Sequence, residues 1–122
     1  MTLSRILVTG AGGFAGRYLT SELAEHGYEV IGLDRSERPE HWSLRNEQYR
    51  VADLRDSGEL ETILSETQPD AIAHLAGWSH VGKSWEDPFG PFEANVINSI
   101  RLYQIASRLL KDQCRFLFVS SA

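Results

Sequence analysis

The sequence predicts an α/β fold with a doubly wound parallel sheet, in which strands and helices alternate along the chain. Three observations support this prediction. Short apolar runs rich in β-branched residues alternate with segments of helical periodicity. A glycine cluster follows the first apolar run, and an aspartate ends the second. We therefore expect five strands in the order 3-2-1-4-5, with the first strand at the centre and right-handed crossovers.

The first part of the chain alternates two strands with one helix. Ser4 to Thr9 is a short apolar run that stops at glycines, which is typical of a buried strand entering a tight loop. From Gly13 to His26 the apolar residues recur at helical spacing, and Gly27 stands where a helix takes its left-handed C-cap. That spacing is set by Phe14, Tyr18, Leu19 and Leu23. Glu29 to Leu33 is a second buried strand, and it ends at Asp34.

The middle of the chain begins irregularly. Residues 35–46 are charged, contain Pro39 and show no period, so we expect a loop, with room for a short helical turn around His41 to Leu44. A weak third strand follows, from Gln48 to Ala52. Ser57 to Thr67 has one apolar helical face and is predicted as a helix with Ser57 as candidate N-cap.

The last part of the chain adds two strands and a helix. Ala71 to Leu75 is the fourth strand, and residues 76–91 form a long loop of the kind that is often functional. Phe92 to Leu110 has too broad an apolar surface for an exposed helix, so we expect it to pack tightly against the sheet. Arg115 to Ser120 is the fifth strand. Its alternating residues are expected in the core: Phe116, Leu117, Phe118 and Val119.

Composition excludes several classes of function. The 122 residues are 42% hydrophobic and 24% charged, which predicts one ordinary domain over residues 1–122. No apolar stretch approaches the roughly 18 to 20 residues of a membrane span, and the net charge of −5 with scattered basic residues argues against nucleic-acid binding. Cys114 has no partner cysteine, and the histidines lack zinc-type spacing. We expect a cytoplasmic protein without a structural metal, a membrane contact or a nucleic-acid partner.

The strongest local signal for a bound nucleotide is the glycine segment TGAGGFAG, from Thr9 to Gly16, between a predicted strand and a predicted helix. In such a segment a turn without side chains approaches a pyrophosphate, the helix N-terminus binds it, and a last glycine allows close packing of helix and strand. This context favours dinucleotide binding over a plain glycine turn. The pattern leaves the role of each glycine open, because G-x-x-G-x-x-G fits Gly10, Gly13 and Gly16 whereas G-x-G-x-x-A fits Gly10, Gly12 and Ala15.

Acidic residues at the ends of later strands extend this candidate site. Asp34 follows Gly16 by 18 residues, where a carboxylate can accept both ribose hydroxyls of an adenosine. It favours NAD over NADP because a 2′-phosphate would meet a like charge, although Arg35 could neutralise that phosphate. Asp53 could reach an adenine amino group, and a helix N-terminal cap is the equally good alternative.

Several segments resemble, in order and spacing, the amino-terminal part of the extended short-chain dehydrogenase/reductase family of NAD-dependent epimerases and dehydratases. The resemblance covers the whole chain and implies a Rossmann-type domain. Ser79 to Trp85 also resembles the loop of nucleotide-sugar 4,6-dehydratases and their reductase relatives that act on GDP-linked sugars. The matching segments are Thr9 to Gly16, Ala52-Asp53-Leu54, His74 to Gly77, Asn95-Val96 and Phe118 to Ala122.

The resemblance implies NAD as cofactor, a nucleotide sugar as substrate and hydride transfer at sugar C4, with NADP the less favoured cofactor. It implies adenine contacts at Asp53 and Leu54, and in Ser121 the hydroxyl that bonds the reacting sugar oxygen. The predicted cofactor site is then Gly10, Gly12, Gly13, Phe14, Ala15, Gly16, Asp34, Arg35, Asp53, Leu54, Leu75, Ala76, Gly77 and Asn95. The predicted substrate site is Ser79, His80, Val81 and Ser84.

The family pattern is incomplete in this sequence. The 122 residues contain no Tyr-x-x-x-Lys motif, no sixth strand and no carboxy-terminal sugar-binding domain. We expect a fragment of a longer enzyme, inactive alone, with the sheet truncated before its sixth strand; a stand-alone, non-catalytic dinucleotide-binding module is the alternative. The family also suggests homodimers through long helices, and the apolar fifth strand would have a free edge. We therefore expect a dimer or a larger assembly.

Three further residues receive structural interpretations. His74, on a predicted strand, is expected to be a hydrogen-bonded core residue. Cys114 is expected to be a small buried hydrophobe. Trp42 could stack on a base or a sugar, but a loop tryptophan more often covers a neighbouring strand end or a missing domain.

Overall fold

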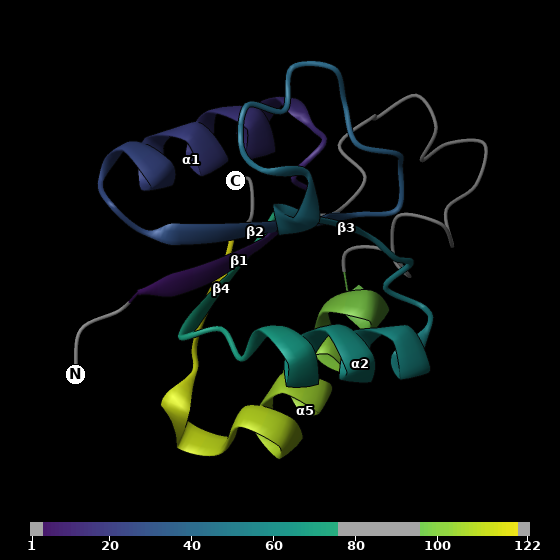
Figure 1. Cartoon of the computed structure of the whole chain (residues 1–122). Coiled ribbons are helices and arrows are strands. Elements are labelled where there is room, and N and C mark those ends of the chain that lie inside the picture. The colour runs from purple at the N-terminus through teal and green to yellow at the C-terminus, as the bar shows by residue number, and fades with distance from the viewer. Residues whose placement is uncertain (1–3, 76–95, 120–122) are drawn as a thin grey trace.

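The computed structural model describes residues 4–75 and 96–119, which form a parallel sheet between two layers of helices (Figure 1). The strands are β1 (Arg5–Thr9), β2 (Glu29–Asp34), β3 (Tyr49–Val51), β4 (Ala71–His74) and β5 (Arg115–Phe118). Their order is β3-β2-β1-β4-β5, and every pair is parallel. The predicted topology is thereby confirmed.

Helices cover both faces of the sheet. Helix α1 (Phe14–Glu25) lies on one face, while α2 (Ser57–Thr67) and α5 (Asn98–Leu110) lie together on the other (Figure 1). Two short 3₁₀ turns complete the described elements, η1 (Asn46–Gln48) and η3 (Lys111–Gln113). Helix α1 ends as predicted, because Gly27, which follows the C-cap His26, adopts a positive φ of 89°.

The central strand β1 is apolar because the protein covers it on both sides. Leu7 lies opposite Ile31 of β2 and Ile72 of β4, and its side chain is fully buried. Successive residues of a strand point to opposite faces, so β1 contributes to two separate cores. This double burial explains why its sequence is a continuous apolar run instead of an alternating one.

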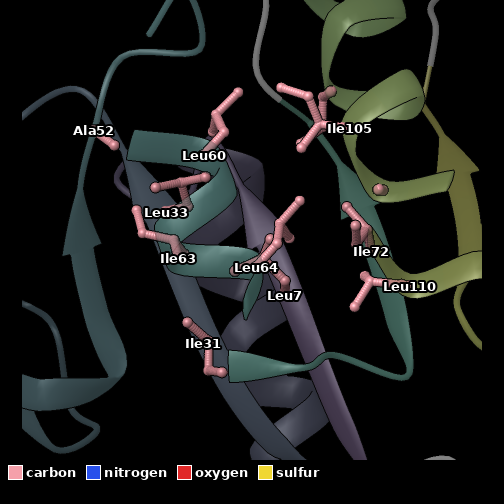
Figure 2. Packing of buried hydrophobic residues seen from close by; sticks show 12 residues of the cluster. Leu7, Ile31, Leu33, Ala52, Leu60, Ile63, Leu64, Ile72, Ile105 and Leu110 are labelled. Carbon is pink, nitrogen blue, oxygen red and sulfur yellow. The ribbon is translucent and has the colours of Figure 1, made fainter. Parts of the chain in front are cut away.

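The two faces of the sheet carry two hydrophobic clusters. Toward α2 and α5, the larger cluster packs leucines and isoleucines of the strands against both helices (Figure 2). It contains Leu7, Ile31, Leu33, Ala52, Leu60, Ile63, Leu64, Ile72, Leu102, Ile105, Ala106 and Leu110. Toward α1, the smaller cluster joins Ile6, Val8, Val30 and Ala73 to partly buried residues that include Leu19 and Leu23.

Some element boundaries differ from the predicted ones. Asp56, and not Ser57, caps α2, because its Oδ1 accepts a hydrogen bond from the Glu59 amide at 3.1 Å. The helical turn predicted around residues 41–44 lies instead at η1. Both differences concern the residue at which a helical turn begins. In a short polar segment several residues can start the turn equally well, so the sequence leaves this residue ambiguous.

The predicted core is too large at three places. On α1, Leu19 and Leu23 pack inward, but Phe14 and Tyr18 lie on the solvent side, where their rings contact each other edge to face at 5.1 Å. On α5, Ile100 and Tyr103 are about half exposed, so the helix buries one stripe and not its whole apolar surface.

Strand β5 is also more exposed than predicted. Leu117, Phe118 and Val119 keep at least half of their surface in solvent, and Phe116 is partly buried. In the described part of the chain β5 pairs only with β4, so one of its edges has no neighbouring strand. Cys114, just before it, is likewise partly and not fully buried.

None of the helices among the described residues combines the length and the apolar character needed to cross a lipid bilayer. Residues 4–75 and 96–119 bring together no group of three or more His, Cys, Asp or Glu side chains that could hold a metal ion.

Candidate functional site

The candidate site lies at the carboxyl ends of the parallel strands. Strand β1 ends at Thr9, and its neighbours β2 and β4 end beside it, at Asp34 and His74. Chain order runs outward from β1 in opposite directions on its two sides, which makes this edge a topological switch point. Open α/β sheets bind ligands in the crevice that forms at such a point.

The glycine segment connects β1 to α1 through a tight turn. Gly10 has a positive φ of 71°, a conformation that favours glycine, and its carbonyl accepts the Gly13 amide at 3.1 Å. Gly13 is the N-cap of α1 and brings no side chain to the helix end. The first turn of α1 contains no acidic residue, so no carboxylate of the helix itself competes for its amides and its positive dipole end.

Close packing identifies the last glycine of the segment and leaves the middle one open, because a Cβ on Gly12 would lie 3.0 Å from Asp34 Oδ2. A Cβ on Gly16 would lie only 2.2 Å from the Gly10 carbonyl oxygen and 2.7 Å from Ala11 Cα, so no side chain fits there. At Gly13 a Cβ would meet only the Gly10 oxygen, at an ordinary 3.4 Å. The turn at Gly10 and the close helix contact at Gly16 correspond to the first and last glycines of G-x-x-G-x-x-G.

Asp34 lies against the glycine segment. Its Oδ2 accepts the Gly12 amide at 2.9 Å, while Oδ1 accepts the amide and the hydroxyl of Ser36, each at 3.1 Å. The side chain is half-buried. These bonds fix the carboxylate beside the loop, whereas an acid in a solvated loop would remain free to rotate.

Tyr49 belongs to the same cluster, although its sequence position gave no signal. The phenol donates to the Ser36 carbonyl at 3.0 Å, and its oxygen would lie 3.0 Å from a Cβ on Gly12. Burial raises the pKa of Tyr49, and the nearby Asp34 charge adds to this effect. Only the register that sets β3 beside β2 brings this side chain to the glycines.

Trp42 packs beneath the glycine segment, against Ala11 and Tyr49. It is buried, and its indole Nε1 donates to the Arg45 carbonyl at 3.1 Å. A Cβ on Gly32 would lie 2.7 Å from the Trp42 ring, so the glycine makes room for the indole on β2. The expectation that Trp42 covers a strand is confirmed.

Asp53 is held by its own loop. Arg55 donates its backbone amide to Oδ1 at 2.9 Å and its Nη2 to Oδ2 at 2.8 Å. These bonds lower the pKa of Asp53 to about 2, and the charge of Arg35 contributes to this effect. The alternative role as helix cap is wrong, because Asp56 caps α2.

His74 lies beneath the site in a buried hydrogen-bonded position. Its Nδ1 lies 2.6 Å from Thr9 Oγ1, and its Nε2 lies 2.7 Å from Ser99 Oγ. Thr9 Oγ1 also accepts the Leu75 amide at 3.1 Å. Desolvation lowers the pKa of His74 to about 4. The prediction of a hydrogen-bonded core histidine is confirmed.

The described residues therefore bring part of the predicted cofactor site together. Gly12 and Asp34 are hydrogen-bonded, and the Arg35 charge acts on Asp53. Phe14 lies exposed at the start of α1, Leu54 packs at the edge of the larger core, and Leu75 follows the end of β4. Gly10, Gly13 and Gly16 form the turn described above, and Ala15 is exposed in the first turn of α1. Eight predicted residues lie outside the described residues: Ala76, Gly77, Ser79, His80, Val81, Ser84, Asn95 and Ser121.

Comparison with known proteins identifies the family. Residues 6–122 match the NAD dependent epimerase/dehydratase family. A UDP-glucose 4-epimerase of Pisum sativum is 29% identical over 97% of this chain and 36% of its own length. The chain thus spans about a third of the length of the curated relatives it matches.

Solved structures agree with these matches. The UDP-glucose 4-epimerase of Thermus thermophilus, in complex with NAD, is 30% identical with a TM-score of 0.74, over 86% of this chain and 34% of that one. The Thermotoga maritima enzyme with UDP-glucose is 28% identical with a TM-score of 0.79, over 96% of this chain and 38% of that one. The sheet order, the glycine turn and these matches together show that the chain belongs to the NAD-dependent epimerase/dehydratase family.

Proposed function

We propose that this chain is the NAD-binding portion of a nucleotide-sugar epimerase, dehydratase or reductase, which works by hydride transfer between the nicotinamide and sugar C4. One observation carries the proposal. The Asp34 carboxylate, at the end of β2, is hydrogen-bonded at 2.9 Å to the amide of Gly12 in the turn that opens α1. This bond joins the acid that we propose binds the ribose to the loop before the helix end that we propose binds the pyrophosphate, which supports a dinucleotide as ligand.

The residues present fit a dinucleotide. The exposed Gly13 leaves open space at the N-terminus of α1, where backbone amides would hold the pyrophosphate. Asp34 would accept the ribose hydroxyls, and Asp53 and Leu54 would face the adenine. When bound, NAD supplies the hydride acceptor, and the chain contributes binding and orientation. Leu75, Ala76, Gly77 and Asn95 would line the rest of the cofactor.

The cofactor is NAD in this proposal. A 2′-phosphate would stand beside the half-buried Asp34 carboxylate and meet its negative charge. Arg35 is exposed and its charge already acts on Asp53, so it is less suited to neutralise a phosphate at Asp34. NADP remains the less favoured cofactor.

The substrate is a nucleotide sugar. The relatives are UDP-glucose 4-epimerases, and one similar structure contains UDP-glucose, which supports a UDP-linked hexose. The resemblance of residues 79–85 to GDP-sugar dehydratases supports a GDP-linked sugar instead. We favour the UDP-linked hexose, since the relatives match nearly the whole chain whereas the loop is one short segment. Turnover assays with UDP-glucose and with GDP-mannose, on a longer polypeptide that also carries the Tyr-x-x-x-Lys motif, separate the two substrates.

Chemistry requires residues beyond the cofactor site. We propose that Ser121 bonds the reacting sugar oxygen and that a longer polypeptide supplies the Tyr-x-x-x-Lys motif, which the 122 residues do not contain. The substrate-side residues would be Ser79, His80, Val81 and Ser84. We place this enzyme in the cytoplasm, as its single cysteine predicts.

Calorimetric titration of NAD tests the proposed cofactor site. Asp34→Ala removes the ribose acceptor, and Gly13→Val places a branched side chain over the loop, so each should abolish measurable NAD binding. Glu25→Ala, an exposed acid at the far end of α1, is the matched control and should bind NAD like the parent. Unchanged affinity in both site variants would refute the proposal. Tighter binding of NADP than of NAD by the parent would overturn the cofactor preference and point to Arg35.

A further inference from the structure

Arg101 connects helix α5 to the loop that carries Asp53. It lies in the first turn of α5 and is half-buried. Its Nη1 donates to the Leu54 carbonyl at 3.3 Å and to Asn98 Oδ1 at 2.5 Å. Leu54 precedes Arg101 by 47 residues, so this contact joins two distant parts of the chain.

Apart from the packing of the Leu54 side chain and the Arg55–Asp53 bonds, the loop between β3 and α2 is held by hydrogen bonds at its two ends. At its start, the Ala52 amide donates to the Asp34 carbonyl at 2.9 Å. At its end, the Asp56 amide donates to the Asp53 carbonyl at 2.9 Å, and Asp56 caps α2. The Leu54 carbonyl lies between these anchors, and Arg101 holds it from the side of α5.

The geometry points to a role for Arg101 through the backbone. The cationic side chains that act on the Asp53 carboxylate are Arg55 and Arg35, and Arg101 instead binds the neighbouring main-chain oxygen. Asn98 is buried and accepts from the same Nη1, which limits the rotation of the guanidinium. A half-buried carbonyl that lost this donor would turn toward water, because unsatisfied polar groups are costly to bury.

We propose that Arg101 is a positioning residue for the adenosine half of the dinucleotide. It fixes the Leu54 carbonyl so that Asp53 and Leu54 keep a single orientation toward the adenine ring. This inference rests on the proposed function, since it assigns the adenine to this loop. It adds a residue of α5 that does not touch the cofactor but determines how selectively its base is recognised.

Three variants of the full chain separate hydrogen bonding from packing. Arg101→Met keeps an unbranched stem and removes both donated bonds. Arg101→Lys restores a donor, because a single nitrogen makes both bonds in the parent. Arg108→Met is the matched control, since Arg108 lies on the same helix but pairs with Glu61 of α2.

The measurement compares NAD with nicotinamide hypoxanthine dinucleotide, in which a carbonyl oxygen replaces the adenine amino group. The parent should prefer NAD, because the Asp53 carboxylate accepts from the amino group and repels the carbonyl. Arg101→Met should reduce this preference about tenfold, because the loop would no longer hold the Asp53 carboxylate toward the adenine amino group. A loss of this size is at the lower end of what a hydrogen bond to a charged group contributes. Arg101→Lys should recover most of it, and Arg108→Met should leave it unchanged. An equal preference in Arg101→Met and the parent would overturn the proposal, as would a parent without any preference.

Amide hydrogen exchange in the free protein provides a second readout that does not depend on the cofactor. Arg101→Met should lower the protection of the Asp56 amide, which bonds inside the loop, and Arg108→Met should not. Equal protection in both variants would also overturn the proposal. If the parent binds neither dinucleotide, the proposed function fails, and the exchange result still decides whether Arg101 holds the loop.

Discussion

His74 joins three elements of the fold through one neutral ring. The imidazole contacts Thr9 at the end of β1 and Ser99 on α5, and it belongs to β4 itself. Both partners are hydroxyl groups, which can donate or accept, so the uncharged ring fits either tautomer. Neither of these two partners is a carboxylate that could stabilise a charged ring, and the burial of His74 makes its protonation unfavourable.

Stability should therefore fall in mild acid. The folded-state pKa of His74 is lowered from 6.5 to about 4, so the unfolded chain binds the proton first. The contribution of neutral His74 to the free energy of unfolding is complete above pH 6.5 and is lost as the pH falls toward 4. The free energy of unfolding should be lower by about 2 kcal/mol at pH 5 and by about 3 kcal/mol at pH 4. Urea unfolding of the parent and of His74→Asn at pH 7, 5 and 4 measures this loss. A stability difference between the two proteins that stays constant with pH would contradict the assignment.

Some residues of the candidate site could be predicted from the sequence, and others could not. Gly10, Gly16 and Asp34 could be predicted because their positions relative to a strand and a helix are fixed by local spacing. Tyr49 and Ser36 could not, because they meet Gly12 only after β3 has paired with β2. The roles of neighbouring acids such as Asp53 and Asp56 depend on where the first helical turn begins.

Helix α2 owes its start to one carboxylate. Asp56 has an extended backbone and accepts the Glu59 amide, whereas Ser57 is already the first helical residue. The helix ends at Thr67, and its C-cap Gln68 adopts the left-handed conformation with a φ of 45°. Because α2 supplies Leu60, Ile63 and Leu64 to the larger core, its start also sets the packing of that face.

Substitution of the cap residue Asp56 should lower the stability of the protein, whereas substitution of Ser57 should not. Asp56→Ala should lower the free energy of unfolding by about 1 kcal/mol, since one helix amide loses its acceptor. Ser57→Ala is the matched control and should change it by only a few tenths of that amount. Chemical denaturation at neutral pH measures both values. The opposite order would show that α2 begins one residue later.

The elements themselves were largely predictable, but their exposure was not. Apolar runs of strand length and the helical periods located the described strands and helices to within a few residues, including the end of α5 at Leu110. That helix begins at Asn98, while residues 92–95 of its predicted span lie outside the described residues. The exposure of α5 and β5 depends on what lies beside them, and a single chain's periodicity carries no information on neighbours.

At the scale of the whole molecule, apolar surface gathers on the side of α5 and β5. Tyr103, Phe116 and Phe118 form an aromatic cluster there, with Phe116 and Phe118 ring centres 4.6 Å apart. The exposed apolar residues of these two elements are Ile100, Tyr103, Leu117 and Phe118. Surfaces of this kind on a sheet edge or a helix promote association.

The isolated chain should therefore form a dimer or a larger species. Light scattering coupled to gel filtration should give a mass above the 13.7 kDa of one chain. Ile100→Glu should reduce the mass if α5 mediates the contact, and Leu117→Glu if the β5 edge does. Phe14→Glu, on the opposite face, is the control and should leave the mass unchanged, although Phe14 is 81% exposed. A folded monomer at high micromolar concentration would contradict the prediction.

The central position of β1 also has a consequence for synthesis on the ribosome. Strand β1 needs a neighbour on each side and is translated before both of them, and its partner on the far side, β4, comes 65 residues later. At about 5 to 20 residues per second, one edge of the nascent β1 stays open for about 3 to 13 s after that strand has been made. The β3-β2-β1 half can pair during this interval, and until β4 arrives its apolar edge is the segment most in need of a chaperone.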